Sequence, residues 1–287
     1  MRDLALTFAG GGSRAFYQVG LLEDWIDALE PRLGAVAACS AGAAMAALVL
    51  ARRTEQARES FARRRIGVRG HLDFRRLLRG QRPFPHDAIY RATLTDALSD
   101  GGFDRLKALP FPVRILCATF PRRVRGPVGV AAGLGAYQLE KVLRPKLVHP
   151  SFPQKLGFRP RAWDARECAT VEDLVELIVS SSSTPPFTSL GRFGNHELID
   201  GSMVDNAPAF LAEREPSVTR NLVLLTRPHH PSRLGWQGRR LYIAPERKLP
   251  IARWDYTEHA PVDETLAIGR ADARHHHKAF EAFLARS

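Results

Sequence analysis

Two turns of the chain carry residue types suited to acyl-transfer chemistry. In one of them Ser40 follows an apolar run over residues 35–39 and precedes two small residues, Ala41 and Gly42. A serine at a sharp strand-to-helix turn projects its hydroxyl from the strand end, and the helix that follows offers unpaired N–H groups and the positive end of its dipole. The spacing matches the nucleophile pattern Gly-x-Ser-x-Gly, except that Ala38 replaces the first glycine. Ser40 is therefore a candidate nucleophile, although this pattern also occurs often by chance and the turn alone leaves both interpretations open.

The other turn spans residues 10–15, Gly-Gly-Gly-Ser-Arg-Ala, and follows an apolar run over residues 4–9. Successive N–H groups without bulky side chains form a concavity that binds anions, and such donors stabilise the oxyanion of an acyl-transfer transition state. The turn is not a P-loop, because no Gly-Lys-Ser/Thr follows it. It formally satisfies the dinucleotide-binding pattern Gly-x-Gly-x-x-Ala, but the second predicted strand does not end in the acidic residue which that fold uses. Dinucleotide binding is therefore the weaker alternative.

A serine nucleophile needs a base that removes its proton, and the two turns supply none. None of the ten histidines stands at the end of a predicted strand, where a catalytic triad would place it. Asp200 does stand there: it closes a short run over residues 196–200 and precedes Gly201, with Asn206 and Pro208 downstream. An Asp-Gly pair is also common in ordinary turns, so this segment alone leaves both interpretations open.

Taken together, these segments resemble the patatin-like phospholipases. The residues that carry the resemblance are, in chain order, the glycine turn over 10–15, Ser40-Ala41-Gly42, Ser-Ser-Ser-Thr-Pro-Pro-Phe over 181–187, and Asp200-Gly201 with Asn206 and Pro208. The resemblance covers roughly residues 4–52 and 171–210. Three positions where the family has glycine differ here, and none of them is a reacting group: Ala15, Ala38 and Ser202.

The resemblance implies an α/β fold with a Ser-Asp dyad, in which Ser40 is the nucleophile, Asp200 is the base and no histidine takes part. Asp200 would accept the Ser40 proton during attack on an ester carbonyl, and water activated by Asp200 would release the fatty acid from the acyl-enzyme. The expected oxyanion donors are Gly10, Gly11, Gly12, Ser13, Arg14 and Ala41, and the residues expected to support the motifs are Gly42, Gly201, Asn206 and Pro208.

The expected function is that of a lipid acyl hydrolase of the phospholipase A or lysophospholipase type, which needs no cofactor and no metal ion. A non-catalytic lipid-binding or scaffold protein with a patatin-like fold is the alternative, because the turn around the serine is altered at Ala38. The presence of both Ser40 and Asp200 favours the enzyme.

The elements that must position these residues follow from hydrophobic periodicity. Apolar runs predict strands over 4–9, 35–39, 112–120, 196–200, 221–226 and 241–244, and three- and four-residue spacings predict helices over 13–30, 43–49, 171–180 and 263–285. This order predicts a three-layer α/β/α fold with a central, mostly parallel sheet, and we expect residues 1–287 to form a single domain. The stretch of about residues 121–160 is rich in glycine and proline, which predicts irregular structure and a lid or cap over the site.

The charge of the chain is unusual for a protein of ordinary apolar content. A total of 42 basic and 30 acidic residues gives a net charge of +12, and arginines are concentrated in residues 51–82, where apolar side chains alternate with them. This basic segment is interpreted either as a solvated helix pair or as a basic, partly apolar rim that meets anionic lipid head groups. The expected partners are a lipid acyl ester and an anionic membrane surface. No nucleic-acid motif accompanies the charge.

The three cysteines, at positions 39, 117 and 168, form no CxxC pair, so neither a disulfide framework nor a zinc site is expected. The chain starts without a signal-peptide pattern and contains no apolar run long enough to span a membrane. We therefore expect a cytoplasmic protein, with peripheral contact with membranes.

Overall fold

The computed structural model describes residues 1–122, 124, 126–143, 147–149 and 152–285. Its centre is one sheet with the strand order β5-β6-β3-β2-β1-β7-β9-β8, to which β4 is added by pairing with β3. The bounds of the strands are β1 (Leu4–Phe8), β2 (Leu33–Cys39), β3 (Val113–Thr119), β4 (Arg159–Asp164), β5 (Gly191–Phe193), β6 (His196–Asp200), β7 (Arg220–Leu224), β8 (Gly235–Gln237) and β9 (Arg240–Ile243).

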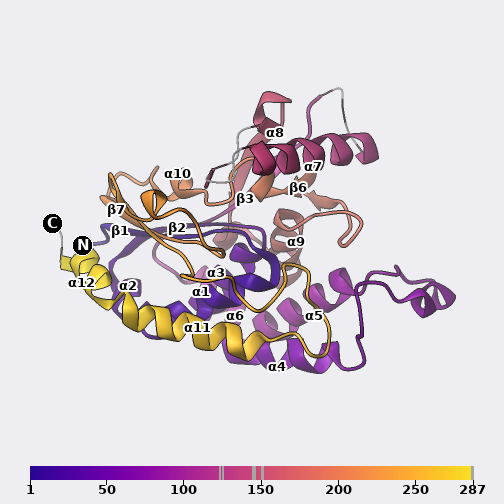
Figure 1. Ribbon diagram of the computed structural model, residues 1–287, viewed down its shortest axis with the longest axis horizontal. Helices are drawn as coiled ribbons and strands as arrows, with labels where there is room; N and C mark the ends of the chain where they lie inside the picture. The colour runs from indigo at the N-terminus through magenta and orange to yellow at the C-terminus, as the bar shows by residue number, and fades with distance from the viewer. Residues whose placement is uncertain (123, 125, 144–146, 150–151, 286–287) are drawn as a thin grey trace.

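The five central strands, β3-β2-β1-β7-β9, run parallel. Antiparallel pairings occur where β4 and β6 meet β3, where β5 meets β6 and where β8 meets β9. Because β1 begins beside the N-terminus, the carboxyl ends of the parallel strands point away from both termini, which lie close together (Figure 1). The sheet is therefore mixed, with a parallel centre, as the alternation of strands and helices predicts.

Helices cover both faces of the sheet (Figure 1). Their bounds are α1 (Phe16–Glu23), α2 (Ile26–Leu29), α3 (Ala41–Leu50), α4 (Thr54–Arg65), α5 (His86–Ser99), α6 (Gly102–Lys107), α7 (Gly126–Leu143), α8 (Phe152–Lys155), α9 (Val171–Ser181), α10 (Ala209–Ala212), α11 (Val262–His275) and α12 (His277–Ala285).

Alternating side chains of β1 show why three layers form. Leu4, Leu6 and Phe8 are buried in a core shared with α1, α3 and α11, whereas Ala5 is buried in a second core that receives Tyr137 of α7 and residues of α10. Side chains of a strand point alternately to opposite faces, so a strand that is apolar on both sides needs helices on both sides. The predicted three-layer α/β/α architecture is confirmed.

Two predicted helices differ in extent from the helices of the structure. The expected helix over 13–30 is divided into a 3₁₀ turn, η1 (Gly12–Ala15), then α1 and α2, with a turn at residues 24 and 25 between the two helices. The terminal helix is divided at His276 into α11 and α12. Apolar residues that pack on the core occur on both sides of each break, so the apolar pattern alone does not reveal the breaks.

The expectation of irregular structure over 121–160 is wrong for much of that segment. Residues 126–143 form α7, because Val130, Leu134 and Tyr137 fall on one helical face and pack on the second core. Residues 123, 125, 144–146 and 150–151 of the expected lid lie outside the described residues. Within the described residues, no helix combines the length and the apolarity needed to cross a membrane.

Candidate active site

Ser40 occupies a strained turn between β2 and α3. Its backbone adopts φ 53° and ψ −139°, a combination that non-glycine residues rarely take and that is concentrated at functional sites. The turn is tight: a Cβ atom at Gly42 would lie 2.6 Å from the carbonyl oxygen of Ala9. Ala38, by contrast, has its methyl group fully buried in the core beneath the turn. The core thus accommodates the methyl group of Ala38. The position at which the turn needs a glycine is Gly42, where the backbone passes close to the Ala9 carbonyl.

The sheet brings Asp200 to Ser40 although 160 residues separate them. In β3, Leu116 pairs with Cys39 at the end of β2, and the next residue, Cys117, pairs with Asp200 at the end of β6. Ser40 Oγ lies 3.0 Å from Asp200 Oδ2 and donates a hydrogen bond to it. Both side chains are buried, with exposures of 3% and 2%.

Three further groups donate hydrogen bonds to the Asp200 carboxylate. The backbone N–H of Ser202 binds Oδ1 at 2.8 Å, and the hydroxyl of Thr184 binds Oδ2 at 3.3 Å. The guanidinium of Arg253 forms an ion pair with Oδ2 at 3.4 Å. We did not predict any contact of Arg253 with Asp200, because this arginine lies in an irregular loop that no motif marks.

Ser181 holds the turn at Ser40 in place. The backbone N–H of Ser40 donates to Ser181 Oγ at 2.8 Å, and the Ser181 hydroxyl in turn donates to the carbonyl of Leu116 at 2.6 Å. All of these groups are buried. The N–H of Ser40 is therefore occupied within the protein, and Ser181 joins the end of α9 to both strands of the site.

The loop that follows α9 fixes Asp200 from the other side. The carbonyl of Ser183 accepts the N–H of Asp200 at 2.9 Å, and Thr184 binds the carboxylate as described. Within the loop, Ser183 Oγ donates to the carbonyl of Ser189, and Thr188 Oγ1 accepts the N–H of Thr184 at 2.6 Å. The serine-rich run over 181–187 thus supplies hydrogen-bond partners to both members of the Ser40–Asp200 pair.

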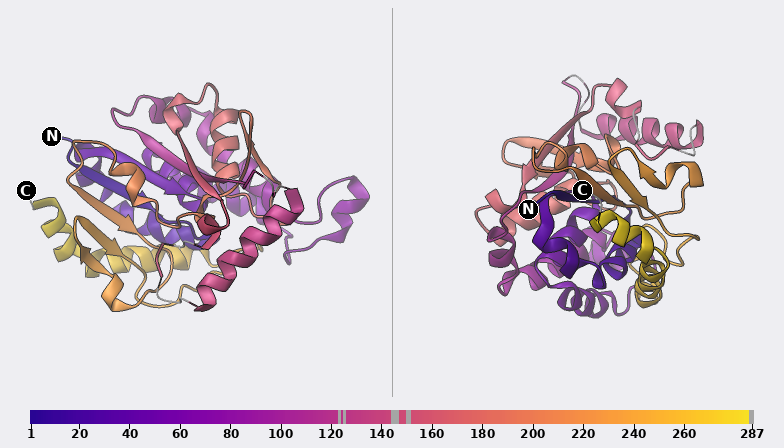
Figure 2. Two further views of the ribbon diagram at one scale, coloured as in Figure 1. Left: turned by 90° about the horizontal axis from the view of Figure 1, so that it is seen from above. Right: turned by 90° about the vertical axis from the view of Figure 1, so that its left-hand side faces the viewer.

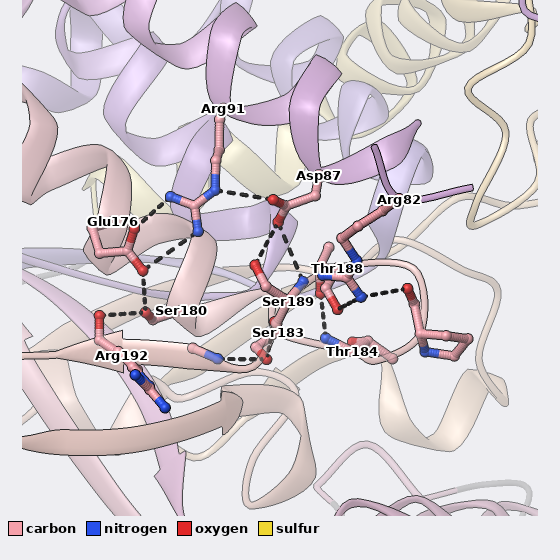
Figure 3. Close-up of polar contacts among 12 residues, drawn as sticks. Arg82, Asp87, Arg91, Glu176, Ser180, Ser183, Thr184, Thr188, Ser189 and Arg192 are labelled. Atoms are coloured by element: carbon pink, nitrogen blue, oxygen red, sulfur yellow. Dashed lines mark hydrogen bonds and ion pairs between the residues drawn. The ribbon is translucent and has the colours of Figure 1, made fainter. Parts of the chain in front are cut away.

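Helices α5 and α9 anchor this loop through a polar network (Figure 3). Arg91 of α5 pairs with Asp87 one turn away and with Glu176 of α9. The Asp87 carboxylate accepts the N–H and the hydroxyl of Ser189, and Arg82 donates to the carbonyls of Pro186 and Thr188. The position of Asp200 therefore depends on α5 as well as on α9, whose last residue, Ser181, also binds the turn at Ser40.

The glycine turn lies against the same pair of residues, but its N–H groups are not equivalent. The N–H of Gly10 donates to the Asn206 carbonyl at 2.9 Å, and that of Ser13 donates to the Arg253 carbonyl at 3.0 Å. Gly11 and Gly12 have no such partner among the backbone contacts of the described residues. Arg14 donates through Nε to the carbonyl of Gly11 at 3.2 Å. Of the six expected oxyanion donors, Gly10 and Ser13 thus have their N–H groups bound within the protein, whereas those of Gly11 and Gly12 remain open to a ligand.

Neither cysteine nor histidine takes the place of Ser40 and Asp200 at this site. Burial, and next to it the charge of Asp200, raises the pKa of the Cys39 thiol, which therefore stays neutral and unreactive. No described histidine hydrogen-bonds to Ser40; its hydroxyl meets Asp200. His149 instead contacts Asp205 at 2.7 Å, and His86 contacts the carbonyl of Trp254 at 3.0 Å.

An apolar pocket begins beside the two turns. Gly12 and Ser13 of the glycine turn and Ala41, the first residue of α3, line a cavity of about 30 Å³, and the rest of its wall comes from α1, α3, α4, α5 and Tyr256. A second cavity of the same size shares four lining residues with it, Phe16, Met45, Leu48 and Ala57, and ends at the charged side chains Glu23, Glu55, Arg58 and Arg270. The two cavities therefore adjoin each other between the candidate site and the surface.

The basic segment over 51–82 has two parts. In α4, Arg58 pairs with Glu55 and Asp263, and Arg64 pairs with Asp96, so these charges belong to a solvated helix face. The remainder exposes large apolar side chains, namely Ile66, Leu72, Phe74, Leu77 and Leu78. This part projects from the body of the molecule at the end away from the termini, where α7 also lies (Figure 2).

Comparisons with known proteins give a family match and a structural match. The family model described as patatin-like phospholipase matches residues 6–213. Among solved structures, the crystal structure of VipD from Legionella pneumophila is similar to this chain, with 12% sequence identity and a TM-score of 0.48 over 98% of this chain and 67% of that chain. A comparison with curated protein sequences gives no match. Because the family match takes in both turns and Asp200 and extends over well more than half of the chain, the protein belongs to the patatin-like phospholipase family, a family of lipid acyl hydrolases.

Proposed function

We propose that the protein cleaves acyl ester bonds of lipids, as a phospholipase A or lysophospholipase, with Ser40 as nucleophile and Asp200 as base. The observation that carries the proposal is the 3.0 Å hydrogen bond between these two buried side chains at neighbouring strand ends. The strained backbone of Ser40 adds support, since such a conformation costs about 1–3 kcal/mol and persists only where the surroundings enforce it.

In the proposed mechanism, Asp200 Oδ2 accepts the proton of Ser40 as the Ser40 oxygen attacks the ester carbonyl. The leaving alcohol receives that proton, and an acyl-enzyme on Ser40 remains. Water then loses a proton to Asp200 and attacks the acyl carbonyl, which releases the fatty acid and returns the proton to Ser40. Arg253 pairs with the same oxygen, Asp200 Oδ2, and stabilises the carboxylate form of Asp200 before and after each proton transfer.

The oxyanion is proposed to bind the N–H groups of Gly11 and Gly12 together with that of Ala41, the first residue of α3. The first N–H groups of a helix have no intrahelical acceptor. Gly10 and Ser13 support the turn instead, since their N–H groups are already bound to carbonyls. Removal of one oxyanion donor typically costs about 2.7–4 kcal/mol of transition-state stabilisation.

The acyl chain is proposed to enter the apolar pocket that starts at Gly12, Ser13 and Ala41. This placement sets the ester carbonyl beside the proposed oxyanion donors while the chain extends away from the dyad. The alcohol part of the lipid then lies on the opposite side of Ser40, toward Asp200 and Arg253.

The exposed apolar side chains of the basic segment, together with α7, are proposed to contact an anionic membrane. In α7, Val128, Leu139, Val142 and Leu143 are exposed while the opposite face packs on the second core. We also propose that residues 1–287 act as one domain, because a single sheet takes strands from both halves of the chain. On this proposal α7 is the lid-like element of the site.

Fluorophosphonate labelling tests the proposed function. We expect the wild-type protein and the control Ser232→Ala, which changes an exposed serine, to be labelled, and Ser40→Ala to remain unlabelled. Asp200→Asn is expected to lower hydrolysis of p-nitrophenyl butyrate at least about 100-fold, in the range seen for loss of a general base. If the wild-type protein neither reacts with the probe nor hydrolyses the ester, the non-catalytic lipid-binding alternative replaces the enzyme.

A further inference from the structure

Three arginines surround the glycine turn from three separate parts of the chain. Arg14 belongs to the turn and donates to the carbonyl of Gly11. Arg227 follows Thr226, whose hydroxyl donates to the carbonyl of Gly10 at 2.8 Å. Arg253 covers Gly12 so closely that a Cβ atom there would lie 2.0 Å from the Arg253 carbonyl oxygen.

Among the described residues, Arg14 and Arg227 lack an acidic partner, unlike the enclosed Arg220 and Arg240. Arg220 pairs with Asp3 and Arg240 with Glu213. Among the described residues, Arg253 has a carboxylate within ion-pair distance, that of Asp200, whereas Arg14 and Arg227 have none and reach only backbone carbonyls. Within the described part of the chain, Asp200 is thus the one carboxylate that pairs with this group of arginines, and it pairs with Arg253.

The electrostatic effect of this grouping is repulsive in the unliganded protein. Burial, followed by the charges of Arg253 and Arg227, lowers the pKa of Arg14 to about 10. Burial also lowers the pKa of Arg227, and Arg253 lowers it further. Tyr137 of α7 lies within electrostatic reach of the same three arginines and of Asp200. Partly buried cations without counter-charges are costly, so they indicate a place that an anion completes.

We propose that Arg14, Arg227 and Arg253 form an anion subsite that holds the phosphate group of a lipid substrate beside the dyad. The inference rests on the proposed function, and it assigns the head-group side of the same site. Arg227 and Arg253 lie beyond residues 6–213, so the family match does not account for them.

Phosphate is the anion that the geometry favours. Planar guanidinium groups bind phosphate oxygens through paired N–H groups, and several of them converge where a phosphate is recognised. The two charges left after Arg253 is paired with Asp200 match a phosphate monoester dianion. None of the three arginines lines the apolar pocket that begins at Gly12, Ser13 and Ala41, so the acyl chain and the phosphate are assigned to different parts of the site.

Arg227→Gln is the informative variant, because Arg227 has no contact with the dyad, whereas Arg253 does. Arg233→Gln is the matched control. Arg233 lies six positions after Arg227, is exposed and has no ion pair among the described residues, so the control removes the same charge without touching the proposed subsite. The first measurement is the melting temperature with inorganic phosphate, with glycerol 3-phosphate, or with chloride at equal ionic strength. We expect both phosphates to raise the melting temperatures of the wild-type protein and of Arg233→Gln. The increase for Arg227→Gln should be far smaller. In chloride alone, Arg227→Gln should melt no lower than the wild-type protein, since repulsion is relieved.

The second measurement compares hydrolysis of phosphatidate and of diacylglycerol with the same acyl chains in neutral detergent micelles. We expect Arg227→Gln to lower the ratio of the two kcat/KM values about tenfold, mainly through KM for phosphatidate, because a charge-assisted contact is lost. Arg233→Gln should keep the wild-type ratio.

The outcomes separate the two proposals. If phosphate stabilises the wild-type protein through Arg227 but no ester is cleaved, the proposed hydrolase fails and the anion subsite stands. If esters are cleaved with a ratio that Arg227→Gln leaves unchanged, the subsite for a lipid phosphate is overturned. Stabilisation by inorganic phosphate alone, without glycerol 3-phosphate, also overturns it, because the site then binds free phosphate rather than a head group.

Discussion

At the scale of single residues, the candidate site depends on a hydrogen-bond chain that holds a strained serine. Ser40 has a positive φ, and its N–H is bound by Ser181, which is itself bound to the Leu116 carbonyl. Truncation of Ser181 would remove the hydrogen-bond acceptor of the Ser40 N–H and the hydroxyl that donates to the Leu116 carbonyl. Ser181 is therefore a positioning residue for the proposed nucleophile.

We predict that Ser181→Ala lowers kcat for p-nitrophenyl butyrate about tenfold and leaves KM nearly unchanged, because a lost buried hydrogen bond costs about 1–3 kcal/mol. Ser181→Thr keeps the hydroxyl and should restore most of the activity. Steady-state kinetics and the rate of fluorophosphonate labelling provide the two readouts. A wild-type labelling rate in Ser181→Ala would show that the turn holds its shape without this contact.

A second residue-scale prediction concerns the apolar pocket. Thr93 of α5 lines it, is 6% exposed, and has a hydroxyl without a hydrogen-bond partner among the described residues. Thr93→Leu adds volume inside the pocket, so we expect kcat/KM for a dodecanoyl ester to fall several-fold relative to that for a butyryl ester. Thr93→Val keeps the shape and serves as the control. An unchanged chain-length profile in Thr93→Leu would place the acyl chain elsewhere.

At the scale of elements, α7 has two faces with different environments. Val130, Leu134 and Tyr137 face the second core, while Leu139 and Val142 are 54% and 77% exposed. A helix with an apolar face that the rest of the protein leaves exposed is typical of an element that meets a lipid surface. The location of Tyr137 within reach of Asp200 and Arg253 ties this helix to the candidate site.

We predict that the double substitution Leu139→Ser and Val142→Ser lowers the ratio of activity on anionic vesicles to activity on a soluble ester several-fold. The reason is the loss of apolar area, at about 25 cal/mol per Å², from the face that meets the lipid. Leu156→Ser, at a residue that is 52% exposed and lies outside α7, is the control. An equal ratio in all three proteins would remove α7 from the membrane contact.

At the scale of the whole molecule, a cluster of aromatic and histidine side chains ties the loop that carries Arg253 to α5. His86, the first residue of α5, is 1% exposed and donates through Nε2–H to the carbonyl of Trp254, while its Nδ1 has no hydrogen-bond partner in the part of the chain that the structure describes. Burial, and to a lesser extent the nearby His71, lowers the pKa of His86 to about 4. The ring is therefore neutral in the folded protein near pH 7.

The folded protein binds a proton at His86 less readily than the unfolded chain, whose histidines titrate near pH 6.5. The contribution to the free energy of unfolding is complete above pH 6.5 and is lost as the pH falls toward 4, by at most about 3 kcal/mol. Chemical denaturation across this interval should show a smaller loss for His86→Gln than for the wild-type protein. Burial also lowers the pKa of His229 to about 4, so part of the loss persists in the variant.

The control for this prediction is His259→Gln, at an exposed histidine close to the same loop. It should follow the wild-type dependence of stability on pH. Equal slopes for the wild-type protein and His86→Gln between pH 6.5 and 4 would mean that His86 gains a proton in the folded state without cost.

The sequence by itself determined the family and the order of the strands that carry Ser40, the glycine turn and Asp200. These features are local: a turn needs small residues, an exposed serine needs a sharp bend, and a buried strand needs an apolar run. The same local reasoning missed α7, whose inward face is spread over Val130, Leu134 and Tyr137 among glycines that predict a loop. It also missed β4, β5 and β8, of which β5 and β8 are only three residues long.

Only the tertiary structure decided how the N–H groups of the glycine turn are used and which distant side chains surround it. The carbonyl of Arg253 binds Ser13, its guanidinium meets Asp200, and Ser181 binds Ser40, although 141 residues separate the last pair. Such contacts follow from the register of β2, β3 and β6 and from the path of a loop, and neither leaves a periodic or compositional mark in the chain. The charge of +12 is visible in the sequence, but its convergence on the glycine turn depends on the folded backbone.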